Sequence, residues 1–139
     1  DGWMIVHIQR RDVLRQLLSK YVANARGGFH KKDDQPESIR LNVPETEFLA
    51  NYERRLGWLE SESLLLAGLP YQSITYEEHL ESPDAHQPLI DSVFTRLGLE
   101  RRTVSTPLRK ISNGNTNELL ANAASLRQAF EAKGWEWTL

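Results

Sequence analysis

Apolar positions along this chain alternate between short continuous runs and a helical repeat, and each change marks a new element. Residues 4–8 (Met-Ile-Val-His-Ile) form a short run rich in β-branched side chains, which predicts a buried strand. A helix is predicted next, with Asp12 as its N-cap and Gly27-Gly28 at its end. Its apolar stripe recurs at helical spacing at Val13, Leu14, Leu17, Leu18, Tyr21, Val22 and Ala25.

A polar loop over residues 27–44 leads to a second, longer helix. This helix is predicted from about residue 45 to residue 67, where Gly68 ends it. The run Leu64-Leu65-Leu66 predicts deep burial near the end of the helix. The remaining apolar stripe comprises Phe48, Tyr52, Leu56 and Leu59.

A second strand is predicted over residues 71–76. A helical region opens at Ser82-Pro83, where Pro88 is expected to delay the regular helix and Gly98 to end it. The sequence that follows, residues 101–114, is irregular and basic.

The last helix is predicted to begin at a capping box over residues 115–118 (Asn-Thr-Asn-Glu). Its apolar contacts extend from Leu119 to Phe130, and Gly134 closes it. Trp135 and Trp137 follow, and we expect them to cover part of a core.

The order strand–helix–helix–strand–helix–helix predicts an α/β fold, helix-rich, with a small parallel sheet flanked by helices. Two strands make a poor sheet by themselves, and the chain starts directly at a strand. We therefore expect residues 1–139 to form a single domain that is the C-terminal portion of a larger fold, or a chain whose sheet a partner completes.

The composition of the chain excludes only a few classes of function. The net charge of −2 gives no indication of a nucleic-acid partner, and the absence of cysteine excludes disulfides and thiolate chemistry. No apolar run approaches the ~20 residues of a membrane span, and we expect a cytoplasmic protein. His79 and His86 are too widely spaced for a metal site on one helix face, so no metal is predicted. The acidic pair Glu77-Glu78 is interpreted as a solvated face.

The junction between the first strand and its helix is the sharpest candidate for chemistry. Arg10 ends the strand, and Ser19 falls on the outward face of the helix. Ligands of open α/β sheets bind beyond the carboxyl ends of strands, and a guanidinium with a hydroxyl suits a phosphate. The alternative interpretation is a solvated Ser and an Arg that only flanks the strand.

Residues 5–12 (Ile-Val-His-Ile-Gln-Arg-Arg-Asp), with the helix through Ser19, resemble the 3′-phosphate segment of sulfotransferases that use 3′-phosphoadenosine 5′-phosphosulfate (PAPS). The resemblance implies that Arg10 and Ser19 bind the 3′-phosphate of adenosine. Residues 74–80 (Ile-Thr-Tyr-Glu-Glu-His-Leu) resemble the family's Tyr-Glu-Asp-Leu segment, which implies that Tyr76 contacts adenine. Without the resemblance, Tyr76 is interpreted as a residue packed at the domain edge.

Two later segments follow the family's order. Residues 93–99 resemble the Phe-Leu-Gly ending of a family helix, and residues 105–110 resemble a late basic segment in which Lys110, or Arg109, would neutralise phosphate. The resemblance implies a P-loop-type fold and transfer of a sulfuryl group from PAPS to a hydroxyl or amine of a small-molecule or glycan acceptor, leaving 3′-phosphoadenosine 5′-phosphate (PAP). The family's Lys-containing loop for the 5′-phosphosulfate and its catalytic His have no counterpart here, so no catalytic residue is predicted.

Two alternatives stay open from the sequence. The chain is either a non-catalytic helical interaction module whose sheet is completed by self-association or by another chain, or a fragment of another nucleotide-dependent phosphoryl-transfer enzyme such as a kinase relative.

Overall fold

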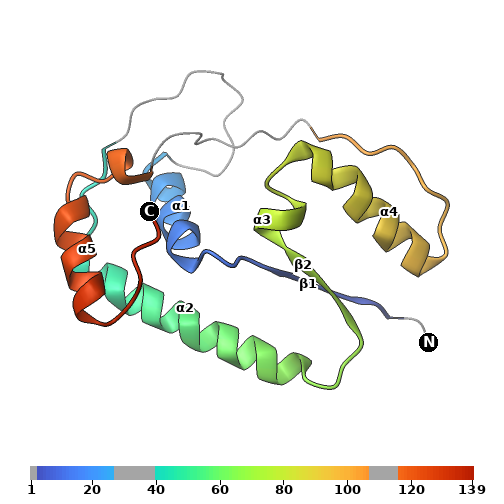
Figure 1. Ribbon diagram of the computed structural model, residues 1–139, viewed down its shortest axis with the longest axis horizontal. Helices are drawn as coiled ribbons and strands as arrows, with labels where there is room; N and C mark the ends of the chain where they lie inside the picture. Colours follow the sequence, from blue (N-terminus) through green and yellow to red (C-terminus); the bar gives the residue numbers. More distant parts are fainter. Residues whose placement is uncertain (1–2, 27–39, 107–115) are drawn as a thin grey trace. The chain divides into compact units, whose positions relative to one another are not determined.

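The computed structural model describes residues 3–26, 40–106 and 116–139 as an α/β arrangement in which helices predominate (Figure 1). The described order confirms the predicted class and the alternation of strands with helices. In chain order the elements are β1 (Ile5–Gln9), α1 (Val13–Arg26), α2 (Glu45–Leu66), β2 (Tyr71–Thr75), α3 (Tyr76–His79), the 3₁₀ turn η1 (Pro83–Ala85), α4 (His86–Leu97), the 3₁₀ turn η2 (Thr116–Leu119) and α5 (Ala123–Ala132).

The sheet of the described chain consists of β1 and β2, which pair in parallel. Their register runs from Ile5 opposite Tyr71 to Gln9 opposite Thr75. The predicted parallel pairing is therefore confirmed. Because parallel strands end at the same edge of a sheet, the residues that follow Gln9 and Thr75 leave the sheet side by side.

The chain groups into two compact units. The sheet unit comprises Asp1–Arg11 and Glu62–Pro107 and holds both strands, α3 and α4. The helical unit comprises Asp12–Ser61 and Leu108–Leu139 and holds α1, most of α2, and α5. The single-domain organisation of residues 1–139 stays a prediction.

The core of the helical unit is built around aromatic rings. Phe130 packs edge to face against Tyr52, with ring centroids 4.5 Å apart, and against Trp135 at 5.1 Å and Trp137 at 5.6 Å. The two tryptophans at the end of the chain therefore cover this core. Its buried members are Leu14, Leu17, Leu18, Val43, Phe48, Leu120, Leu126 and Phe130.

The predicted burial at the end of α2 is wrong. Leu64 and Leu65 are 73% and 76% exposed, and Leu66 is the one member of the run that is partly buried. Successive helical residues point about 100° apart, so three adjacent leucines cannot all face one neighbour. A continuous apolar run therefore overestimates burial on a helix that packs along one side.

The predicted start of the last helix is also wrong. Residues of the expected capping box lie in η2, and α5 begins only at Ala123. Between them the backbone pairs with Leu41, whose N–H donates to the Leu119 carbonyl at 2.7 Å and whose carbonyl accepts from the Ala121 N–H at 2.7 Å. A long-range backbone pair thus replaces the first helical turn that local sequence favours.

Asn122 reinforces this pairing from the position just before α5. Its Oδ1 accepts the Val43 N–H at 3.0 Å, and its Nδ2 donates to the Val43 carbonyl at 2.8 Å. The side-chain amide therefore acts like one more backbone unit and fixes residues 41–43 against the start of α5.

Helix α4 begins at His86, after the 3₁₀ turn Pro83–Ala85, so the regular helix starts later than the opening at Ser82-Pro83. Pro88 lies within its first turn, where backbone N–H groups have no acceptor inside the helix, so the ring removes no hydrogen bond. Gly98 ends the helix in the left-handed conformation (φ 67°), as predicted, and its N–H donates to the Thr95 carbonyl at 3.2 Å.

Neighbouring helices contact both faces of the sheet in the sheet unit. On one face Ile74 is buried and Gln72 donates from Nε2 to Ser92 Oγ of α4 at 2.8 Å. On the other face the His7 imidazole Nε2 lies 3.4 Å from Glu62 Oε2, near the end of α2. The strands are thus held between two helical segments.

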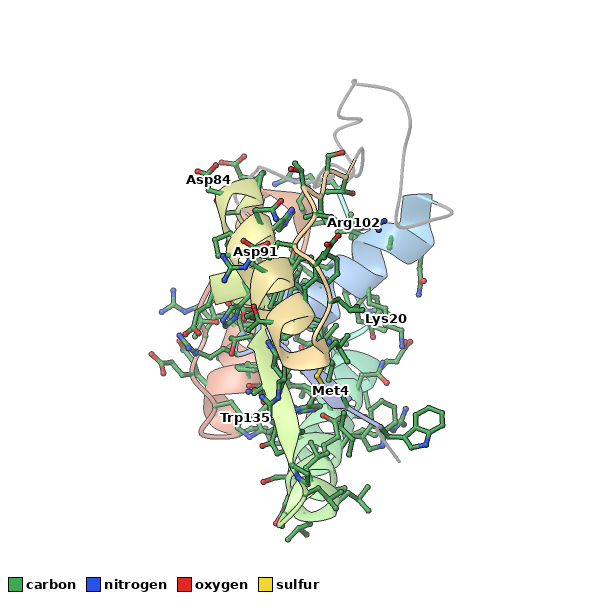
Figure 2. All side chains as sticks on the ribbon, turned by 90° about the vertical axis from the view of Figure 1, so that its right-hand side faces the viewer. Met4, Lys20, Asp84, Asp91, Arg102 and Trp135 are labelled. Atoms are coloured by element: carbon green, nitrogen blue, oxygen red, sulfur yellow. The ribbon has the colours of Figure 1, made fainter. Side chains whose placement is uncertain are left out.

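An extended segment runs beside α4 and carries residues 101–106 without regular structure, as predicted for this part of the chain. Gln87 Nε2 donates to the Arg102 carbonyl at 3.0 Å and to Asp91 Oδ1 at 2.8 Å, while the Val104 N–H donates to Gln87 Oε1 at 2.8 Å. Figure 2 shows α4, marked by Asp91, next to the segment marked by Arg102. Across the described residues, no helix combines the length and apolar character that a membrane crossing requires.

We expect Leu126→Ala to lower the free energy of unfolding by about 3 kcal/mol, because removal of a fully buried leucine leaves a cavity. Leu65→Ala is the matched control: the same change at a helical residue that is 76% exposed should cost less than about 0.5 kcal/mol. Urea denaturation followed by circular dichroism measures both. Equal losses for the two variants would contradict the core described above.

Candidate functional site

The ends of β1 and β2 bring charged and aromatic side chains together. We define the carboxyl-end cluster as Arg10 and Arg11, which follow β1, with Tyr76, Glu77 and Glu78, which follow β2 in α3. All five residues belong to the sheet unit. Figure 1 shows α3 starting where β2 ends. Parallel register therefore places a basic pair next to an acidic pair at one edge of the sheet.

Arg10 is held from two sides. Its Nε donates to Glu77 Oε1 at 3.4 Å, and its guanidinium carbon lies 4.1 Å from the centroid of the Tyr76 ring. The Arg10 and Glu77 side chains are only 16% and 18% exposed, so water screens this pair less than a surface ion pair. The cation–π contact adds to the attraction. Within the part of the chain that the structure describes, the Nη atoms of Arg10 donate to no protein acceptor.

Glu77 links both arginines of the cluster. While its Oε1 accepts from Arg10, its Oε2 accepts the backbone N–H of Arg11 at 3.0 Å. The Arg11 guanidinium pairs with Glu78 instead, and these side chains are 70% and 50% exposed. The inner pair therefore fixes the geometry of the cluster, and the outer pair contributes little to stability.

His79 fixes the turn that presents Tyr76. Its Nδ1 lies 3.1 Å from the Thr75 backbone nitrogen and 3.0 Å from the Thr75 carbonyl oxygen. A neutral imidazole with an unprotonated Nδ1 accepts the Thr75 N–H, and a protonated Nδ1 donates to the carbonyl. In either form, His79 links the end of α3 to the end of β2. No group of three or more potential metal ligands occurs among the described residues.

Ser19 lies in α1, and its hydroxyl has a partner within that helix. The Ser19 hydroxyl donates to the Arg15 carbonyl one turn earlier in α1, at 2.8 Å, and Ser19 belongs to the helical unit. A phosphate site shared by Arg10 and Ser19 therefore stays a prediction. Lys110 and Arg109 lie outside the described residues.

Asp12 caps α1, as its sequence position predicted. Its Oδ1 accepts the Arg15 N–H at 2.8 Å, and the Thr138 hydroxyl donates to the same atom at 3.4 Å. Asp12 also affects Tyr52 of α2. Burial is the main reason that the pKa of Tyr52 is raised above 10.0, and the negative charge of Asp12 raises it further.

The sequence indicates Arg10 and Tyr76 but not the role of Glu77. From the sequence, Glu77 and Glu78 are interpreted as a solvated acidic face, although the Glu77 side chain is only 18% exposed and that of Glu78 is 50% exposed. The available signal was the position of two acidic residues after one strand and two basic residues after the other. Parallel strands of an α/β fold end together, so such pairs are expected to meet.

Comparisons of the chain with protein-family models, with curated proteins and with solved structures find no match. The chemistry of the carboxyl-end cluster therefore has to follow from its own groups, which are two guanidiniums, two carboxylates and a phenol. A guanidinium stacked on an aromatic ring suits a ligand that combines an anion with a flat ring.

We expect Asp12→Ala to destabilise the protein by about 1 kcal/mol, because the first turn of α1 loses its side-chain acceptor. Asp12→Asn keeps an oxygen at this position and should lose clearly less stability than Asp12→Ala. Denaturant unfolding compares the two variants. If both lost the same stability, the charge of Asp12 and not its capping would be responsible.

The Asp12→Asn variant should also lower the pKa of Tyr52 without bringing it down to 10.0. Removing the negative charge of Asp12 makes the tyrosinate less unfavourable, whereas burial, the larger cause, is unchanged. Tyrosinate absorbance during an alkaline titration measures this, with Tyr52→Phe identifying the signal. An unchanged Tyr52 titration would show that the two residues do not interact.

Proposed function

We propose that the carboxyl-end cluster binds the 3′-phosphate and the adenine of a PAPS-type nucleotide, as one side of a sulfotransferase donor site. The observation that carries this proposal is the contact of the Arg10 guanidinium with the Tyr76 ring at the ends of two parallel strands. These are the two residues to which the family resemblance assigns the phosphate and the base.

The geometry suits such a ligand. In open α/β sheets, ligands bind outside the carboxyl ends of strands, where both residues lie. The Nη atoms of Arg10 supply charged donors for a phosphate. Because Arg10 covers one face of the Tyr76 ring, the opposite face or the ring edge is the surface for adenine.

In this proposal the chain belongs to a P-loop-type sulfotransferase fold. Arg10 and Ser19 hold the 3′-phosphate of PAPS, Tyr76 contacts adenine, and Lys110 neutralises a phosphate. The reaction is in-line transfer of a sulfuryl group to a hydroxyl or amine of a small-molecule or glycan acceptor. Such a reaction requires mainly positioning and charge neutralisation, which is the part these residues supply.

A second candidate is a non-catalytic interaction module completed by self-association. Two observations favour it: the exposure of Leu64 and Leu65, and a described sheet of only two strands. Sedimentation analysis tests this candidate. A mass that rises with protein concentration, in a chain that binds no nucleotide, would favour it over the donor site.

Calorimetric titration with PAP and with adenosine 5′-monophosphate tests the first proposal. We expect the chain to prefer PAP, and Arg10→Ala to weaken PAP binding by about tenfold or more, since a hydrogen bond to a charged group is worth about 1.5–3 kcal/mol. Binding of adenosine 5′-monophosphate, which lacks the 3′-phosphate, should change much less.

Arg96→Ala is the matched control for this titration. It removes the same charge from an exposed residue in the last turn of α4, in the same unit, and should leave PAP binding unchanged. If a chain that is folded by circular dichroism does not prefer PAP over adenosine 5′-monophosphate, the proposed donor site is rejected.

A further inference from the structure

Glu77 occupies the charged side of Arg10. Its Oε1 lies 3.4 Å from Arg10 Nε, and the two side chains are among the less exposed charged groups of the sheet unit. The positive charge of Arg10 is therefore already balanced inside the protein. Any anion that approaches the Nη atoms of Arg10 comes close to this carboxylate as well.

The two oxygens of Glu77 have different partners. Oε2 accepts the Arg11 backbone N–H at 3.0 Å, a contact that does not involve the Arg10 side chain. Glu77 can therefore release the Arg10 guanidinium and stay attached to the end of β1 through Oε2. The stacking of Arg10 on Tyr76 likewise does not depend on Oε1. Arg10 thus stays in place while it changes its ionic partner.

We propose that Glu77 is an internal competitor for the ligand phosphate, so that phosphate binding requires Arg10 to exchange the Glu77 carboxylate for the phosphate. This inference rests on the proposed nucleotide site and adds a residue that determines its affinity and specificity. A phosphate alone has to displace or tolerate the carboxylate. A nucleotide gains the contact of its base with Tyr76 in addition, so the competitor favours the nucleotide over inorganic phosphate.

Two isosteric variants separate this competition from a general change in charge. Glu77→Gln removes the negative charge but keeps an oxygen that accepts the Arg11 N–H. Glu78→Gln removes the same charge from the next residue, which pairs with Arg11 in an exposed position. The two variants have equal net charge, so a difference between them reports on the position next to Arg10.

The experiment is a calorimetric titration of the unaltered chain and both variants with PAP and, separately, with inorganic phosphate. We expect Glu77→Gln to bind PAP about tenfold more tightly, the lower end of what a charge within ~4–6 Å exerts on an ionised group. Glu78→Gln should change the affinity less than about twofold. The gain should vanish when Arg10→Ala is added, since the competition is for Arg10.

The outcomes distinguish this inference from the proposed function. If the unaltered chain prefers PAP and Glu77→Gln binds it no more tightly, the competitor is rejected and the nucleotide site stands. If Glu77→Gln gains Arg10-dependent affinity for inorganic phosphate while no protein prefers PAP over adenosine 5′-monophosphate, the competitor stands and the nucleotide site is rejected. Absence of binding of either probe to every folded protein overturns both.

A measurement on the unaltered chain covers the case in which Glu77→Gln does not fold. The Nε–Hε resonance of Arg10, assigned through its loss in Arg10→Lys, reports on the contact with Glu77 Oε1. Exchange of partners must shift this resonance as PAP binds. A bound nucleotide with an unchanged Arg10 resonance would overturn the inference.

Discussion

Parallel pairing of β1 with β2 is the constraint on which the candidate site depends. A parallel pair ends at one edge, and the register that sets Gln9 opposite Thr75 places Arg10 next to the first turn of α3. The site consists of residues that are distant in sequence, and the strand ladder is what joins them. A shift of the register by one residue would turn the side chains of the shifted strand to the opposite face and separate Arg10 from Tyr76 and Glu77. The helices that contact the two faces of the sheet, through Gln72 and His7, help to hold this register.

The helical unit shows the same dependence on contacts between distant residues. Its core relies on Phe130, which four other aromatic rings approach, two of them from the end of the chain. The residues before α5 do not form the helix cap that their sequence favours. They pair with Leu41 and Val43 instead. Where a backbone pair and a side-chain amide satisfy several buried groups together, they outweigh a cap that is worth about 1 kcal/mol.

These contacts explain how far the sequence alone predicts this protein. Local signals were sufficient for the positions of the strands, for Asp12 as a cap, and for Gly98 at the end of α4, because each depends on neighbouring residues only. They were not sufficient for the predicted burial of β1, in which Val6 and Ile8 are 39% and 57% exposed. They failed for Leu64 and Leu65, whose burial depends on which side of α2 has a neighbour. In the candidate site, Arg10 was a candidate from its position at a strand end, and Tyr76 was predicted only from the family resemblance. Glu77 was not, because its role depends on the register between two strands, which a pattern along one strand does not contain.

Glu77 also shows why a binding site in this position has to balance two requirements. A guanidinium that is only 16% exposed is costly to leave without a counter-ion, because burial removes the water that would solvate it. Glu77 removes that cost in the ligand-free protein, and the same charge then opposes an incoming phosphate. Tyr76 resolves part of the conflict, since its ring stabilises the cation in both states and requires no negative charge. The cluster therefore stabilises Arg10 without a ligand and still leaves it available for exchange.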